Sequence, residues 1–311
     1  MKNKPKVIVI GGPTASGKTA LSIELAKKIN GEIISADSMQ IYKYMDIGTA
    51  KPTKDEMQGI KHYLLDFVSP DERFSVSDFT KLANEAIEEI LTKGKTPIIV
   101  GGTGLYIDSL VYGIEFDNSQ IDMEYRRKLE KQVEKEGLEK LYEMAVEIDP
   151  QAMRNISKND KKRIIRVLEI YKQTGKTKTE QEIESRKNEP KYDFDVFILQ
   201  MDREKLYERI NLRVDEMIEN GLVEEVEKIW KKYECFPTAM QGIGYKEVVN
   251  SLEEKISREE MIEQIKQETR RYAKRQITWF NKNKERTRID ALGKRQDNIK
   301  IILEEISEEK K

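Results

Sequence analysis

Cysteine and histidine, two residue types that carry much of protein chemistry, are nearly absent from this 311-residue chain. Cys235 is the only cysteine, which excludes an internal disulfide and any zinc site built from cysteines. His62 is the only histidine, so a hydrolase with a histidine base would depend on one residue that has no supporting motif nearby. We therefore expect a reduced, cytoplasmic setting and chemistry that rests on other residue types.

Long apolar runs are missing as well. No stretch approaches the roughly 18 apolar residues that a membrane span requires. Lysines stand near the N-terminus, but the apolar run that follows them, 7–10, is too short for the core of a signal peptide. Neither repeats nor low-complexity linkers occur, and charged residues make up 36% of the chain. We expect a helix-rich protein with two lobes, in monomeric form and without contact to a membrane.

A glycine-containing segment directly follows the apolar run 7–10. Its residues are Gly12, Pro13, Thr14, Ala15, Ser16, Gly17, Lys18 and Thr19. Glycine, four free positions and then Gly-Lys-Thr is the pattern of a phosphate-binding P-loop. The loop turns backbone N–H groups toward a phosphate, Lys18 supplies a mobile positive charge, and the Thr19 hydroxyl can hold Mg²⁺. The sequence therefore predicts a site for a di- or triphosphate, as in nucleotide-binding and ATP-binding proteins.

The order of strand and helix patterns predicts an α/β fold, with a P-loop NTPase-like parallel sheet as its core. Apolar strand candidates at 6–10, 32–35, 96–100 and 195–201 alternate with helix candidates at 18–29, 76–93 and 203–219. Ligands of such sheets bind beyond the carboxyl ends of the strands. Three motif loops, 12–19, 37–40 and 101–104, follow predicted strand ends, so we expect them to converge on one site.

The middle of the chain has a different pattern. Residues 115–190 are helical in periodicity and strongly charged, with no strand candidate, which predicts an inserted all-helical lobe. The core would then consist of residues 1–114 and 191–311. Its C-terminal part contains further helix candidates at 222–233, 244–250 and 258–284, followed by a short strand and a last helix after Arg288.

Charge is unevenly distributed although the net charge is only −1. Residues 158–178 hold eight basic and two acidic side chains, and residues 266–288 hold nine basic and two acidic ones. Such local excesses, +6 and +7, suit binding to nucleic acid, but they also suit ordinary solvated faces. The helix candidate 258–284 has an apolar side (Met261, Ile262, Ile265, Tyr272, Ala273, Trp279 and Phe280) and a largely opposite basic side (Arg270, Arg271, Lys274, Arg275 and Lys282). It can pack by one side and lie along a phosphate backbone by the other.

Two charged residues are candidates for chemistry. The strand 96–100 runs into two glycines, where kinases and ATPases of this class usually carry an acid, which argues against plain hydrolysis of a nucleoside triphosphate. Asp37 is the nearest acid at a strand end and could be a general base, a Mg²⁺ ligand, or only a cap or turn residue. Arg213 lies beside the apolar stripe of helix 203–219 and could clamp a diphosphate or form a structural ion pair.

Taken in order, the motifs resemble those of the bacterial tRNA dimethylallyltransferases, also called tRNA isopentenyltransferases. The matching stretches are 12–19, 37–42, 45–52, 101–106, 159–160 with 163 and 166–169, 213–214, 242–247 and 271–280. The resemblance implies transfer of a dimethylallyl group from dimethylallyl diphosphate to N6 of the adenosine 3′ to the anticodon, in tRNAs that read codons beginning with U. The P-loop would then hold the diphosphate of the donor.

The same resemblance implies roles for individual residues. Asp37, Thr103 and Arg213 would be catalytic, and Thr19 and Asp37 would hold Mg²⁺ as the cofactor. Contacts to the anticodon stem-loop of tRNA would come from Asp37, Ser38, Met39, Gln40, Thr103, Arg126, Lys162, Arg163, Arg166, Gln241, Tyr245, Lys274, Arg275, Gln276, Thr278 and Trp279. Chemistry on an exocyclic amine requires that the target base leave its stack.

The chain departs from the family pattern at two places, both outside the predicted diphosphate site. At 61–66 the family's Pro-His-His is replaced by Lys61-His62-Tyr63, and at 157–158 its His-Pro is replaced by Ser157-Lys158. Two other interpretations stay open from the residues alone. One is a small-molecule P-loop kinase, and the other is a nucleotide-regulated RNA-binding protein without chemistry of its own.

Overall fold

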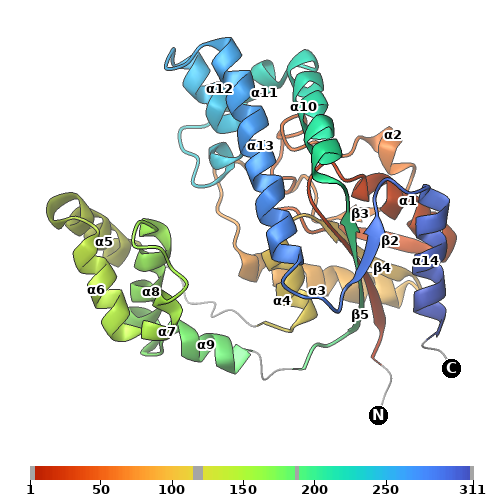
Figure 1. Cartoon of the computed structure of the whole chain (residues 1–311), viewed down its shortest axis with the longest axis horizontal. Helices are drawn as coiled ribbons and strands as arrows, with labels where there is room; N and C mark the ends of the chain where they lie inside the picture. The colour runs from red at the N-terminus through yellow and green to blue at the C-terminus, as the bar shows by residue number, and fades with distance from the viewer. Residues whose placement is uncertain (1–3, 115–121, 186–188, 309–311) are drawn as a thin grey trace. The chain divides into compact units, whose positions relative to one another are not determined.

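The computed structural model describes residues 4–114, 122–185 and 189–308 and is built around a six-stranded sheet (Figure 1). Every hydrogen-bonded pair of neighbouring strands is parallel. In spatial order the strands are β3 (His62–Tyr63), β2 (Gly31–Ser35), β4 (Thr96–Gly101), β1 (Lys6–Gly11), β5 (Asp193–Gln200) and β6 (Thr287–Asp290). The predicted α/β fold with a parallel sheet is confirmed.

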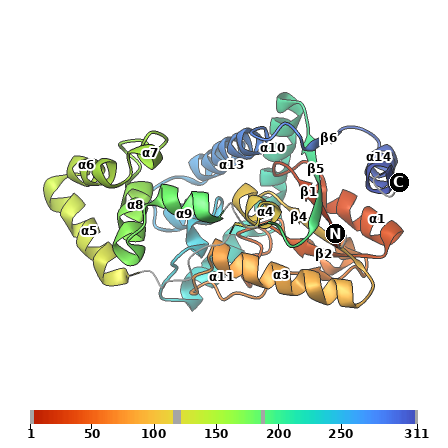
Figure 2. The same ribbon diagram turned by 90° about the horizontal axis from the view of Figure 1, so that it is seen from below.

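Helices cover both faces of this sheet (Figure 2). Successive strand residues point to opposite faces. Val7, Val9 and Ile34 pack with α3 (Val76–Thr92) and α4 (Gly104–Val111) on one face. Ile8, Ile10 and Ile33 pack with α1 (Lys18–Ile29) and α14 (Arg295–Glu308) on the other. Because both faces are covered, the strands are apolar along most of their length.

A second helical group follows β5. It consists of α10 (Arg203–Glu219), α11 (Leu222–Lys232), the 3₁₀ helix η1 (Ala239–Gln241), α12 (Tyr245–Leu252) and α13 (Arg258–Phe280). These helices share a core with Tyr42 and Met45, two residues of the loop that follows β2. The short α2 (Lys54–Met57) lies between β2 and β3 in the sequence. Met39 packs against the same core, so this group contacts the predicted motif loop 37–40.

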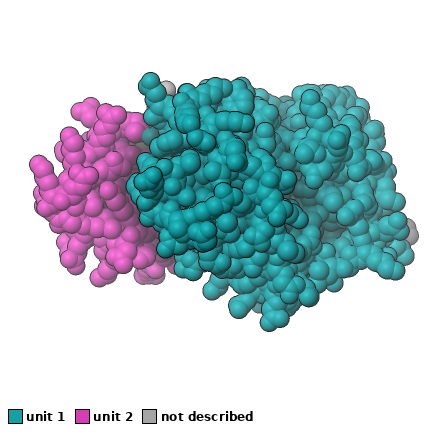
Figure 3. Space-filling view, turned by 90° about the horizontal axis from the view of Figure 1, so that it is seen from above, with its two compact units in different colours: residues 1–111, 191–311 teal, residues 112–190 magenta. Residues whose placement is uncertain are grey.

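The chain forms two compact units (Figure 3). Unit 1 comprises Met1–Val111 and Lys191–Lys311, and unit 2 comprises Tyr112–Pro190. Unit 2 contains α5 (Met123–Glu136), α6 (Glu139–Ile148), α7 (Pro150–Met153), α8 (Lys161–Thr174) and α9 (Lys178–Ser185), around a small apolar core of its own. The boundary predicted at residue 115 lies outside the described residues. Within the described ranges, no helix combines the length and apolarity needed to cross a membrane.

Some elements differ from the sequence prediction. The strand β3 and the helix α2 were not predicted, because segments of two and four residues carry no readable periodicity. Helix α13 ends at Phe280 rather than at 284. There the guanidinium of Arg288 donates to the carbonyls of Phe280 (3.0 Å) and Asn283 (2.7 Å), which satisfies backbone acceptors beyond the last turn. The last strand, β6, begins at Thr287 rather than after Arg288.

Candidate active site

The P-loop connects β1 to α1 at the carboxyl end of the central strand. Its backbone takes the left-handed conformation at Ala15 (φ 60°) and Gly17 (φ 87°). Ala15 pays a steric penalty there because it has a Cβ. Its methyl group is buried against Leu206, Ile210 and Ala273 of α10 and α13, and this packing holds the strained turn in place. Left-handed residues next to other turn residues are typical of loops whose N–H groups bind an anion.

Helix α1 begins at Lys18, and no side chain caps its first N–H groups. Uncapped N–H groups and the helix dipole together attract an anion. Within the loop, the hydroxyl of Ser16 is buried and has no hydrogen-bond partner among the described residues. A buried polar atom without a partner is costly, so this part of the loop is suited to a polar ligand.

Lys18 is influenced by one negative and one positive side chain, Asp37 and Arg213. Its Nζ donates to the carbonyl of Pro13 at 2.6 Å. Burial lowers the pKa of Lys18 to about 7, with a smaller opposing effect from Asp37 and a further lowering by Arg213. The charges of Asp37 and Arg213 therefore both act on the P-loop lysine, as the sequence predicted for one common site.

Two arginines of α10 face the P-loop. Arg213 is half-buried, and burial together with the positive charge of Arg209 lowers its pKa. Arg209 was not predicted. One of its terminal nitrogens lies 3.8 Å from where a Cβ on Gly17 would be. The spacing of four residues, which puts both guanidinium groups on one side of the helix, is the signal that could have revealed it. Like charges placed so close repel each other, and a bound anion would relieve this repulsion.

Asp37 follows β2 and forms a tight turn. Its Oδ1 accepts hydrogen bonds from the backbone N–H groups of Met39 (2.8 Å) and Gln40 (3.2 Å). The interpretation of Asp37 as a turn residue is thus correct. Both bonds use the same oxygen, so the turn does not engage Oδ2. One carboxylate can therefore shape the segment 36–40 and still act on a ligand.

The loop after β4 is tied to the segment 36–40. Thr103 donates its backbone N–H to the carbonyl of Ala36 (3.2 Å), and its Oγ1 accepts from the N–H of Ser38 (3.1 Å). At Gly101 a Cβ would lie 2.1 Å from the carbonyl oxygen of Ala36. P-loop kinases and ATPases usually carry an acid at this strand end. Here the position has room only for glycine. The three motif loops converge, as predicted from the sequence.

Helix α13 connects these loops to one another. Gln276 is only 4% exposed; its Oε1 accepts from the N–H of Thr14 (2.8 Å) and its Nε2 donates to the carbonyl of Gly102 (3.0 Å). One amide group thus bridges the P-loop and the loop after β4. The side chain predicted to contact RNA is used inside the protein.

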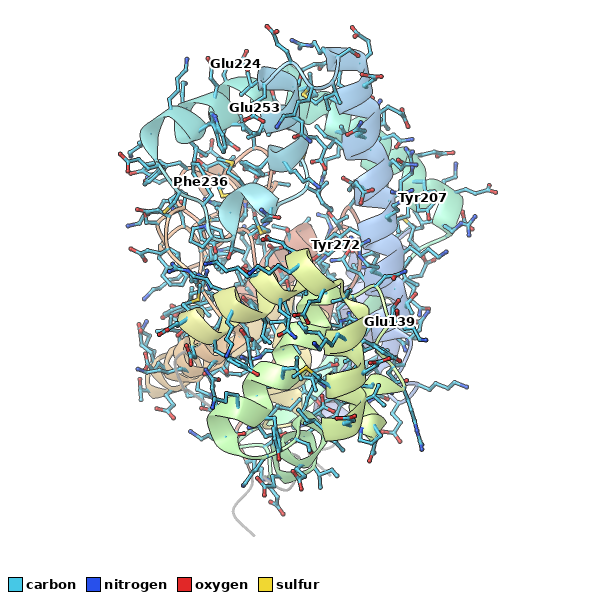
Figure 4. All side chains as sticks on the ribbon, turned by 90° about the vertical axis from the view of Figure 1, so that its left-hand side faces the viewer. Glu139, Tyr207, Glu224, Phe236, Glu253 and Tyr272 are labelled. Atoms are coloured by element: carbon cyan, nitrogen blue, oxygen red, sulfur yellow. The ribbon has the colours of Figure 1, made fainter. Side chains whose placement is uncertain are left out.

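Tyr272 lies one turn earlier on α13 (Figure 4). Its spacing in the sequence placed it on the apolar side of the helix. In the structure its hydroxyl interacts with Thr103 and Gln276. Burial and the negative charge of Asp37 raise the pKa of Tyr272, so it remains a hydrogen-bond donor. Sequence periodicity alone could not distinguish this site residue from a core aromatic.

Trp279 is held at the end of the same helix. Its indole Nε1 donates to Asp108 Oδ2 at 2.7 Å, and the other carboxylate oxygen of Asp108 pairs with Arg286. The ring packs on Gly104 and has Lys282 above it at 4.6 Å. Trp279 is half-buried, so part of the ring remains accessible to a ligand.

The other predicted RNA contacts in unit 1 differ in exposure. Lys274, Arg275 and Thr278 on α13 and Gln241 at the end of η1 are exposed. Arg270, by contrast, donates to Asn211 of α10 at 2.7 Å and so does not belong to the exposed basic side. Between η1, α12 and α13 lies a polar cavity of about 520 Å³, lined by Gln241, Arg271 and Arg275 among others.

Two further predictions for this unit, besides that for Gln276, are corrected. Tyr245 is fully buried, and its hydroxyl donates to Glu225 at 2.6 Å, so its side chain cannot contact RNA. The amide of Gln40 donates to the carbonyls of Thr49 and Ala50, both at 3.1 Å, so it shapes the loop rather than reading a base. The Tyr245 hydroxyl thus satisfies a carboxylate of the protein, and the Gln40 amide satisfies its backbone.

In unit 2 the predicted contacts lie on α5 and α8. Lys162 and Arg163 are exposed. Arg126 forms an ion pair with the fully buried Glu169 at 2.7 Å, and Arg166 lies 3.6 Å from the same carboxylate. The basic excess of this region is smaller than the sequence suggests, because Lys176 and Lys178 pair with acids of α9.

The predicted Mg²⁺ ligands supply only oxygen atoms. The described residues contain no cluster of three or more acids, histidines or cysteines arranged for a metal. Mg²⁺ commonly binds through one or two protein oxygens together with phosphate oxygens and water. Thr19, in the first turn of α1, and Asp37 offer such a pair of donors. This donor set fits Mg²⁺ once a diphosphate occupies the loop.

Comparison with known proteins decides the family. The family model described as IPP transferase matches residues 40–283. The chain belongs to the IPP transferase family. Among curated IPP transferases, it is 57% identical to the tRNA dimethylallyltransferase of Acetivibrio thermocellus over 277 residues, which cover 89% of this chain and 88% of that protein. It is 52% identical over 278 residues to the enzyme of the same name from Caldanaerobacter subterraneus, with 88% of each chain covered.

Solved structures of IPP transferases agree with this assignment. A tRNA isopentenylpyrophosphate transferase from Staphylococcus epidermidis is 43% identical, with a TM-score of 0.73 over 98% of this chain and all of that chain. A eukaryotic dimethylallyltransferase acting on tRNA is 34% identical, with a TM-score of 0.81 over 98% of this chain and 80% of that one. The structural likeness therefore extends over nearly the whole molecule.

Proposed function

We propose that this protein transfers a dimethylallyl group from dimethylallyl diphosphate to N6 of the adenosine 3′ to the anticodon, in tRNAs that read codons beginning with U. The observation that carries the proposal is the convergence of a phosphate loop and a separate carboxylate, Asp37, at one edge of the sheet. The strand end at Gly101 lacks the acid that is typical of NTP hydrolysis. The relatives bearing the name tRNA dimethylallyltransferase support it.

The donor half of the reaction uses the P-loop. The diphosphate would bind the N–H groups of residues 15–19 in the P-loop, with Lys18 and Arg213 against its charges. Charge on the diphosphate grows as the bond from C1 to oxygen breaks, so these groups bind the departing form most strongly. Mg²⁺ held by Thr19 and Asp37 would neutralise part of the same charge.

The acceptor half uses the segment 36–40 and Thr103. An adenine extruded from its stack would present N6 to the carboxylate of Asp37, whose turn fixes its orientation. As N6 bonds to C1, the C1–oxygen bond breaks, diphosphate leaves with the electron pair, and the N6 proton passes to Asp37. The hydroxyl of Thr103 accepts a hydrogen bond from the Ser38 amide and so would hold the segment 36–40 in place.

RNA would dock on exposed basic residues outside this centre. Candidates are Lys274, Arg275 and Thr278 of α13, Gln241, and Lys162 and Arg163 of α8.

We further infer that the protein acts as a monomer in the cytoplasm. All the proposed catalytic groups belong to unit 1 of one chain, so the reaction requires no second copy.

Labelled donor incubated with an unmodified tRNA transcript tests the proposal. Prenylated adenosine in the RNA, with one diphosphate released per transfer, is the expected result. Consumption of ATP without prenylated RNA would favour a kinase instead, and RNA binding without turnover of either compound would favour a binding protein. A transcript that carries guanosine at the target position serves as the control.

A further inference from the structure

Glu225 of α11 accepts four hydrogen bonds at once. Its Oε2 accepts from the backbone N–H groups of Asp46 (2.9 Å) and Ile47 (2.7 Å). Its Oε1 accepts from the N–H of Gly48 (3.1 Å) and from the hydroxyl of Tyr245 (2.6 Å). Three successive N–H groups that point at one carboxylate form an anion nest, and here the anion belongs to the protein.

Tyr245 encloses this nest from the side of α12. Its ring packs so closely on the backbone of Gly48 that a Cβ there would lie 2.5 Å from a ring carbon. Burial and the charge of Glu225 raise the pKa of Tyr245, which keeps its hydroxyl a donor. The carboxylate thus has charge-assisted partners from two separate parts of the chain.

The loop held in this way supports the segment 36–40. The carbonyls of Thr49 and Ala50, next to the nest, accept both bonds of the Gln40 amide, and Ser35 lies 3.5 Å from the Gln40 oxygen. Met39 is pressed against Gly242, three residues before Tyr245, where a Cβ would lie 2.6 Å from its methyl carbon. Glu225 and Tyr245 therefore fix the loop that positions Gln40, and Met39 is positioned by Gly242, next to the start of α12 at Tyr245.

We propose that Glu225 is a positioning residue for the adenosine-binding segment 36–40, and that Tyr245 acts with it. The inference rests on the proposed function, because it assigns the segment to the acceptor. It concerns only one half of the reaction. The P-loop is held by other contacts, those of Ala15 with α10 and α13 and those of Gln276. Loss of the Glu225 carboxylate should therefore weaken use of RNA and leave use of the donor unchanged.

The test compares Glu225→Gln and Tyr245→Phe with Glu224→Gln, a neighbouring and exposed position on the same helix (Figure 4). Glutamine keeps one acceptor oxygen but turns an NH₂ group toward N–H donors. For Glu225→Gln we expect the KM for tRNA to rise about tenfold and the donor KM to change less than about twofold. Tyr245→Phe, which removes one bond of four, should raise the KM for tRNA about threefold. Glu224→Gln should match the wild type.

Hydrogen exchange and direct binding complete the test. Amides 46–48 should exchange faster in both variants, while the amides of α1 keep their protection. Binding of an unmodified anticodon stem-loop should weaken in parallel, and this measurement needs no turnover, so it separates failure of the inference from failure of the proposed function. Equal changes in the KM of donor and RNA, or unchanged exchange at 46–48 in Tyr245→Phe, would overturn the proposal.

Discussion

The two halves of the candidate active site are built on opposite principles. In the proposed donor half, residues 12–19 with Arg209 and Arg213, some polar groups are left to a ligand: the Ser16 hydroxyl has no described partner, and no side chain caps the first N–H groups of α1. In the acceptor half, residues 36–40 and 101–104, the polar groups bind each other. If this assignment holds, the donor half is completed by its substrate, whereas the hydrogen bonds of the acceptor half are formed without one.

The largest effect is expected from Asp37. Asp37→Asn keeps the oxygen that forms the turn with Met39 and Gln40 but cannot accept a proton. We expect kcat to fall by about 10²–10⁴ while tRNA affinity stays nearly unchanged. Asp37→Ala should lose the turn as well and should additionally weaken RNA binding. Single-turnover rates and stem-loop binding measure the two effects, and a wild-type rate in Asp37→Asn would eliminate Asp37 as the base.

Lys18 and Arg213 should come next. Removing either charge, in Lys18→Ala or Arg213→Ala, takes away stabilisation that grows as the diphosphate departs, so kcat/KM for the donor should fall about 100-fold or more. Arg209→Ala should cost about tenfold, because that side chain is exposed and so more solvated. RNA affinity should not change in any of them. If these variants lost RNA affinity and kept donor affinity, the division into two halves would be wrong.

A smaller effect concerns pH. Because the pKa of Lys18 in the free protein is about 7, its charged form dominates only below that value. Diphosphate binds the charged form, so donor affinity should be highest below pH 7 and fall up to about tenfold per unit above it. Lys18→Arg, which stays charged, should flatten this dependence and provides the control for titration of the donor itself. Above pH 7, donor binding should be accompanied by uptake of a proton at Lys18. Calorimetry in buffers of different ionisation enthalpy should detect this uptake.

The smallest effects are expected on the exposed basic side of α13. Lys274→Ala and Arg275→Ala should each weaken tRNA binding by about threefold to tenfold, uniformly across tRNAs, and lower the salt slope by about one. Lys231→Ala, on α11, is a matched control, because that lysine is paired with Glu227. Wild-type affinity that does not change between low and physiological salt would exclude this side of α13 as the docking surface.

Local patterns were enough to predict the P-loop, the strands β1, β2, β4 and β5, and the convergence of three loops at the sheet edge. Glycine spacing and apolar runs express these features within a few residues, and the parallel topology then brings the strand ends together. The family motifs likewise pointed to Asp37 and Thr103, whose loops the structure joins at Ser38.

Long-range partners could not be predicted in this way. Gln276 binds Thr14 across 262 residues of sequence, and neither segment carries a sign of the other. The same holds for Tyr245 and Arg126, whose motif positions suggested RNA but whose polar groups are held by Glu225 and Glu169. A motif marks a residue that the site needs, and only the structure shows whether that residue contacts the ligand or supports the one that does.

The bridge formed by Gln276 has a mechanical consequence. One helix carries this amide, which bonds the P-loop and the loop after β4, and within two residues of it lie the exposed side chains of Lys274 and Arg275. A shift of α13 along its axis would therefore move the P-loop and the loop that carries Thr103 together. Nucleic acid that presses on the outer side of this helix therefore has a direct physical route to the place where the allylic bond is cut.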